Sequence, residues 1–111
     1  MASIPKPRLP SVEEALGASR VAEILGVHPR TIERRRVAGK KLRPLEAQRE
    51  EKLRRIWQEL VRLFTPENAV RWLTNPVPAL DNRPPLDLMA EDGGLDRVLD
   101  TIGRMNWGVP S

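Results

Sequence analysis

The sequence predicts an all-α fold, and two observations support this. Apolar residues recur at spacings of three and four residues over 44–64 and again over 95–105, as they do along one face of an amphipathic helix. In contrast, no segment alternates apolar and polar residues in the way that a half-buried strand would. A chain of 111 residues has room for one compact domain, or for two very small units that share a core.

The first half of the chain is divided by helix start and stop signals. Residues 1–10 hold three prolines and predict a flexible arm. Ser11 is placed to cap a short helix, with an acidic residue three positions later as in a capping box. Ser19 is the candidate cap of the next helix, which Gly26 ends by adopting the left-handed conformation. Pro29 suits the first turn of a third helix, which runs to the glycine that ends the segment RTIERRRVAG.

The second half begins with a long helix and a proline-rich connection. The apolar stripe of the long helix consists of Leu45, Leu53, Ile56, Trp57, Leu60 and Phe64. Thr65 and the proline after it predict a further helix, which ends before Asn75. Residues 75–89 contain four prolines and yet remain apolar. Because each proline restricts the unfolded chain, we expect a stiff loop whose Leu80 and Leu86 are buried.

Two further segments complete the predicted core. Pro85 can begin one more helical turn, LDLM, and Gly93 precedes the last helix, which Gly108 closes. The apolar side of this last helix carries Leu95, Val98, Leu99, Ile102 and Met105. Trp72 and Leu73, on the helix before the proline-rich loop, are expected to pack against the last helix rather than to contact a partner.

Residues 18–37 carry the spacing that a helix-turn-helix needs. Ala22 is small enough for two helices to cross closely, and Gly26 makes the turn. Ile32, together with Val27, would attach the second helix to the core. The second helix would then offer its outer face to the major groove of DNA. A plain pair of helices with an exposed basic face is the alternative, and the spacing alone does not decide between the two.

The distribution of positive charge favours DNA binding. Residues 28–43 carry seven arginines and lysines against the single acid Glu33. The residues placed to contact DNA are His28, Arg30, Thr31, Arg34, Arg35, Arg36, Lys40, Lys41 and Arg43. Either Arg30 or Arg34 can pair bidentately with guanine, whereas the later cations are placed to neutralise phosphates. Because these charges lie on and after the second helix, the sequence predicts a DNA-binding surface there.

The C-terminal half carries the ordered motif F-x4-A-x2-WL-x2-P-x2-AL-x3-P-x-LDL. The motif residues are Phe64, Ala69, Trp72, Leu73, Pro76, Ala79, Leu80, Pro84, Pro85, Leu86, Asp87 and Leu88, followed by Gly93, Gly94, Val98, Ile102 and Gly108. Over residues 64–109 the chain resembles the toxin-binding domain of the MbcA/ParS/Xre antitoxin family. The resemblance extends more loosely over the N-terminal helix-turn-helix, which this family also carries. It departs from the family at Asp81-Asn82-Arg83, where small residues are expected, and at the tail Val-Pro-Ser.

The resemblance implies a type II antitoxin. Such a protein binds a RES-domain toxin, which degrades NAD, and represses its own operon through the helix-turn-helix. In the family the C-terminal end lies near the entrance to the toxin's active site. The matching residues here are Arg104, Asn106, Trp107, Gly108, Val109, Pro110 and Ser111. A large aromatic such as Trp107 suits an interface hot spot, and a lid over the last helix is an equally good alternative for it.

The expected organisation is a flexible arm (1–10), a helix-turn-helix DNA-binding region (11–43) and a helical dimerisation and toxin-binding domain (44–111), in a homodimer. An enzyme is not expected, since there is no cysteine, one histidine and no glycine-rich phosphate loop; the same facts predict neither a metal site nor a cofactor. No apolar run approaches the roughly 20 residues of a membrane span. The start also lacks a signal peptide's apolar stretch, so we expect a cytoplasmic protein. The alternative function is a stand-alone helix-turn-helix transcriptional repressor whose C-terminal domain only dimerises.

Overall fold

The computed structural model describes residues 9–39 and 43–106, and within these ranges the chain is helical with no β-strand. The elements are α1 (Val12–Leu16), α2 (Ala18–Leu25), α3 (Pro29–Val37), α4 (Pro44–Leu63), α5 (Pro66–Thr74), the 3-10 helix η1 (Pro78–Leu80), α6 (Pro85–Met89) and α7 (Gly94–Asn106). This confirms the predicted all-α class. In the described ranges, no helix is both long and apolar enough to cross a membrane.

Two of the predicted side-chain caps, Ser11 and Thr65, are confirmed, and the third, Ser19, is wrong. Ser11 caps α1, where its Oγ accepts a hydrogen bond from the backbone N–H of Glu14 at 3.2 Å. Thr65 caps α5 in the same way. The cap of α2 is Gly17 and not Ser19. Gly17 has a φ of 91°, so the chain reverses at this residue, and α2 starts at once, which places Ser19 inside the helix.

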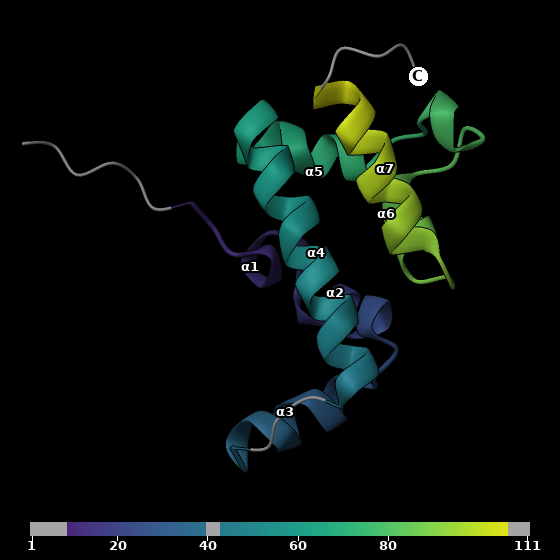
Figure 1. Cartoon of the computed structure of the whole chain (residues 1–111). Helices are drawn as coiled ribbons and strands as arrows, with labels where there is room; N and C mark the ends of the chain where they lie inside the picture. Colours follow the sequence, from purple (N-terminus) through teal and green to yellow (C-terminus); the bar gives the residue numbers. More distant parts are fainter. Residues whose placement is uncertain (1–8, 40–42, 107–111) are drawn as a thin grey trace, which may run out of the picture.

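Helix α4 is the spine of the molecule. It packs against α1, α2, α5 and α7, so that one hydrophobic core runs through both halves of the chain (Figure 1). Its contribution to the core is Leu53, Ile56, Trp57 and Leu60. Leu45 was expected in this stripe but is 61% exposed. The first turn of α4 extends beyond the start of α7 (Figure 1). An ion pair of 2.9 Å joins Asp96, in the first turn of α7, to Lys52, two turns further along α4.

The proline-rich segment between α5 and α7 is a folded part of the core, as predicted. Leu80 on η1 is fully buried and Leu86 on α6 is 5% exposed. An isolated antiparallel bridge joins Val77 to Arg83 and closes the loop around η1. Helix α6 packs on both α5 and α7.

The position of α6 corrects the expectation for Trp72 and Leu73. Helix α5 packs on α1, α4 and α6, whereas the last helix packs mainly on α4 and α6. Leu73 is buried, whereas Trp72 is only partly buried at the edge of the core. Both are packing residues, as expected, but their main surroundings are not α7.

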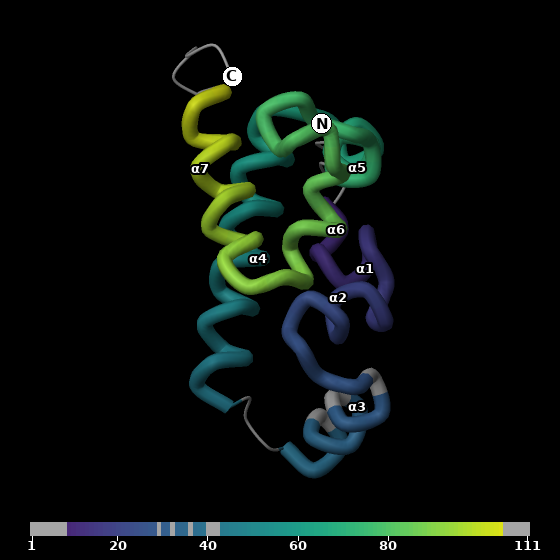
Figure 2. Tube along the Cα trace, turned by 90° about the vertical axis from the view of Figure 1, so that its right-hand side faces the viewer, coloured from purple at the N-terminus to yellow at the C-terminus, as the bar shows by residue number. Residues whose placement is uncertain are grey.

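The two regions of predicted function lie at opposite ends of α4. Figures 1 and 2 both place α3 beside the first turn of α4, and the C-terminal end of α7 beside the last turns of α4. The indole N–H of Trp57, midway along α4, donates a hydrogen bond of 3.0 Å to the carbonyl of Pro10. This contact attaches the end of the predicted arm to the core, and residues 1–8 lie outside the described part of the chain.

Candidate functional site

The turn between α2 and α3 has the geometry that the sequence spacing predicts. Gly26 adopts a left-handed conformation with φ of 76°. Its N–H donates to the carbonyl of Glu23, and the N–H of Val27 donates to the carbonyl of Ala22, which together form a Schellman motif. Ala22 is completely buried where the helices cross. The side chain of Ile32, the remaining residue of the pattern, lies outside the described part.

Gly26 is required for its left-handed conformation, and it also lies close to α4. A Cβ atom at this position would lie 3.0 Å from a guanidinium nitrogen of Arg49 on α4. Arg49 in turn pairs with Asp92, in the loop before α7, at 3.2 Å. The turn of the helix-turn-helix is therefore in close contact with the spine helix.

His28 caps the first turn of α3. Its Nδ1 accepts a hydrogen bond of 3.1 Å from the backbone N–H of Arg30. A neutral imidazole that accepts at Nδ1 carries its hydrogen on Nε2, so the exposed ring keeps a donor for an acceptor such as a phosphate oxygen. Pro29 occupies the first helical position, as predicted.

The exposed face of α3 is built from residues three and four positions apart. Arg30 and Arg34 are both exposed and line one shallow groove, together with Glu33, Val37 and Ala38. Thr31 lies on the neighbouring groove beside Arg34. Val37 is 81% exposed, so this face combines two cations with an apolar surface. Such a face offers both bidentate donors and a contact for the methyl group of thymine.

Arg35 has a different environment from its neighbours on α3. Its guanidinium forms an ion pair with the carboxylate of Glu46 on α4, and the two side chains are only 17% and 12% exposed. Arg43 is the other predicted phosphate contact whose side chain the structure describes, and it is exposed at the N-terminus of α4. The side chain of Arg36, and all of Lys40 and Lys41, lie outside the described residues.

The C-terminal candidate surface is described only in part. Arg104, in the last turn of α7, is exposed and pairs with Asp100 one turn earlier at 3.2 Å. Asn106 is the last residue of α7. The other predicted contacts, Trp107 to Ser111, lie outside the described part of the chain, as does the helix stop at Gly108.

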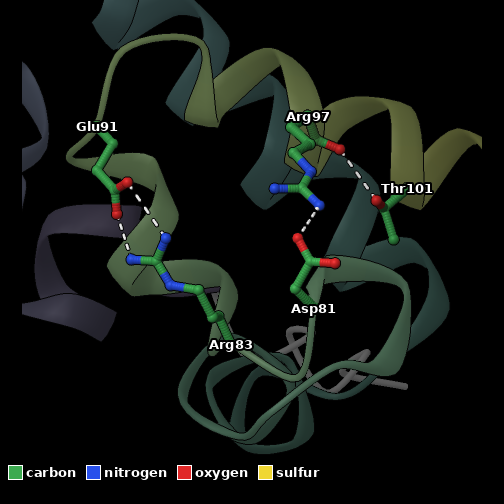
Figure 3. A network of polar contacts seen from close by, with 5 residues as sticks. All are labelled: Asp81, Arg83, Glu91, Arg97 and Thr101. Carbon is green, nitrogen blue, oxygen red and sulfur yellow. Dashed lines mark hydrogen bonds and ion pairs between the residues drawn. The ribbon is translucent and has the colours of Figure 1, made fainter.

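A charged network that the sequence analysis missed holds the proline-rich loop to its neighbours (Figure 3). Arg97 of α7 donates to the carboxylate of Asp81 at 2.7 Å, and Arg83 forms a two-fold ion pair with Glu91 after α6. The hydrogen bond from Arg97 lowers the pKa of Asp81, and that from Arg83 lowers the pKa of Glu91. The partners in these two ion pairs are 16 and 8 residues apart in the sequence and lie on different elements, so the spacing of neighbouring residues does not predict them.

The same network explains one departure from the family pattern. Asp81 and Asn82 have φ values of 58° and 59°, in the left-handed region. After glycine, asparagine and aspartate are the residues that most readily adopt this conformation. Two polar residues, Asp81 and Asn82, therefore form a turn in which the family has small residues. In addition, the carboxylate of Asp81 gains a partner on α7.

Comparison with known proteins gives three agreeing results. The family model described as the antitoxin Xre/MbcA/ParS C-terminal toxin-binding domain matches residues 52–108. The chain is 33% identical over 93 residues to the Antitoxin Xre of Yersinia enterocolitica serotype O:8 / biotype 1B. That match covers 79% of this chain and spans 63% of the length of the relative.

A solved structure agrees with both. A chain in the crystal structure of the M. tuberculosis MbcT–MbcA toxin–antitoxin complex superposes with a TM-score of 0.68 at 31% identity. This match covers 89% of the present chain and 90% of the other. The likeness therefore includes the N-terminal helices as well as the segment that the family model covers.

Proposed function

Because the chain belongs to the antitoxin Xre/MbcA/ParS family, we propose that it is the antitoxin of a type II toxin–antitoxin system. In this proposal it binds a RES-domain toxin that degrades NAD, blocks the active site of that toxin, and represses its own operon by binding operator DNA. The observation that carries the proposal is the match of the toxin-binding family model to residues 52–108. The similarity to a chain of a solved toxin–antitoxin complex supports it.

The toxin contact is assigned to the C-terminal end of α7 and the tail that follows. Arg104 is exposed there, and its ion pair with Asp100 lies on the surface. Because a surface pair contributes little stability, Arg104 can exchange Asp100 for a carboxylate of the toxin at little energetic cost. Trp107 would supply the aromatic anchor and Pro110 a preset tail conformation, which lowers the ordering cost of binding.

The DNA contact is assigned to α3 in a homodimer. Arg30 and Arg34 are the candidates for reading guanine, with His28 and Arg43 as phosphate contacts. Arg35 is assigned a different role, because its guanidinium is already paired with Glu46. A two-fold dimer requires half-sites about 34 Å apart, or a multiple of that distance.

The test is co-expression with the protein encoded by the adjacent reading frame. If that protein is the toxin, cells that express it alone should lose NAD, and cells that also express the antitoxin should retain it. The two proteins should also co-purify. Failure to co-purify or to preserve NAD, together with intact binding to promoter DNA, would leave the stand-alone repressor as the better function.

A further inference from the structure

Helix α3 projects from the end of the molecule, and its described packing is mainly on α2 (Figures 1 and 2). The ion pair between Arg35 and Glu46 ties the C-terminal half of α3 to the first turn of α4, across 11 residues of sequence. Among the ion pairs of the described residues it is the one in which both side chains are most buried. A largely buried, hydrogen-bonded ion pair is more restrictive in geometry than a surface pair.

Glu46 is itself held in place by α4. Its Oε2 accepts a second hydrogen bond, of 3.2 Å, from the backbone N–H of Arg43, the residue that precedes the helix. A carboxylate in the first turn is also favoured by the helix dipole. The carboxylate is thus fixed relative to the spine, so the guanidinium of Arg35 has one fixed point to meet.

We propose that Glu46 is a positioning residue for DNA recognition, which sets the orientation of α3 through Arg35. This inference rests on the proposed DNA binding. Arg30 and Arg34 lie on the open face of α3, and Arg35 is turned about 100° from Arg34 toward α4. With Arg35 fixed, α3 cannot rotate about its axis without breaking the pair. Bidentate contacts to a base need this restraint, because a hydrogen bond of about 2.9 Å weakens within a few tenths of an ångström.

Electrostatics alone makes the opposite prediction for Glu46. A carboxylate near a DNA-binding face repels phosphates, so its neutralisation would strengthen binding to any duplex. Positioning predicts that the same change weakens binding to the operator. The sign of the effect therefore separates the two roles.

The experiment measures the affinity of the full chain for a duplex of its own promoter and for an unrelated duplex of equal length. Glu46→Gln should lower affinity for the promoter duplex about 10-fold, a loss of the size expected for one interaction of this kind, and should leave affinity for the unrelated duplex unchanged or raised. The matched control is Glu50→Gln, since Glu50 pairs with Arg54 within α4 at 2.9 Å, and none of the contacts described for Glu50 is with α3. The control should keep full affinity for the promoter duplex.

A second arm shows whether Glu46 acts through Arg35. In an Arg35→Met background, Glu46→Gln should cause no further loss of promoter affinity, because the pair is already broken. A general weakening of the α4 N-terminus would persist in that background. Hydrogen exchange without DNA supplies an independent readout: Glu46→Gln should speed exchange of α3 amides and leave those of α5 to α7 unchanged.

Two results would overturn the proposal in distinguishable ways. Faster exchange in α3 with unchanged or increased promoter affinity shows that the pair fixes α3 but that DNA recognition does not depend on it. A parent protein that binds neither duplex overturns the proposed DNA binding itself, and the positioning role with it.

Discussion

Arg97 on α7 donates a hydrogen bond of 2.7 Å to the carboxylate of Asp81, in the turn after η1. The pair fastens a turn with two consecutive left-handed residues to the last helix of the core. It is also the contact that most lowers the pKa of Asp81.

The first prediction concerns acid stability. Because the folded-state pKa of Asp81 is lowered, the ion pair contributes stability above the ordinary aspartate value, and this contribution is lost as the pH falls through the lowered pKa. Asp81→Asn keeps a residue suited to the left-handed conformation but removes the charge. Urea unfolding should show the parent to be the more stable at pH 7 and the two proteins to converge in acid. Arg97→Gln should abolish the same pH dependence, and a parent–variant difference that persists undiminished in acid would refute the assignment.

The second prediction concerns the core. Leu73 is 1% exposed on α5, so Leu73→Ala should lower the free energy of unfolding by about 2–5 kcal/mol. Leu45→Ala makes the same chemical change at a side chain that is 61% exposed, and should stay within about 0.5 kcal/mol of the parent. Urea unfolding of both variants measures the contrast. Equal effects would mean that α5 is not packed as described.

The third prediction concerns DNA. Arg34→Ala should cost about 1–3 kcal/mol of binding free energy on the promoter duplex and relax sequence specificity. Arg62→Ala removes the same charge at the opposite end of α4, from a side chain that is 72% exposed, and should change neither quantity appreciably. Anisotropy titrations at several salt concentrations provide the measurement. A similar loss in the two variants would indicate a purely electrostatic, non-specific contact.

The fourth prediction concerns the toxin. Deletion of residues 107–111 removes none of the core residues that the structure describes, so the truncated protein should unfold at nearly the parent temperature and still bind DNA. It should nevertheless fail to maintain NAD in cells that express the toxin. Full protection by the truncated protein would move neutralisation to another surface, of which the exposed loop from Asp81 to Pro84 is the first to examine.

Local signals predicted the helices well. Caps such as Ser11 and Thr65, and the stop at Gly26, depend on residues within a few positions, and each is found where the sequence places it. The cap was misplaced at Ser19 because the chain already turns into α2 at Gly17, two residues earlier. Periodicity likewise identified the apolar face of α4. It carries no information about how far neighbouring helices extend along that face, which is why Leu45 was misassigned.

Long-range pairings were the part that the sequence did not reveal. The ion pair between Arg35 and Glu46 joins a predicted phosphate contact to an acidic residue on the next helix. From the sequence, each of the two would be expected only to be a charged residue on the surface. Similarly, nothing in the spacing around Trp72 indicates that α6 lies between most of α5 and the last helix. Such relations depend on how helices of known extent are placed in three dimensions.

The parallel pairing of α4 with α7 has a consequence for the order in which the chain can fold. The other main contacts of α7 are with η1 and α6, and α4 contacts α5 directly after it, so most of the helices can associate as they leave the ribosome. The face of α4 that packs on α7 remains open until α7 has emerged from the ribosome. Completion of the described core therefore waits for the helix whose far end carries the proposed toxin contact, so under the proposed function the chain becomes stable and able to bind a toxin at nearly the same time.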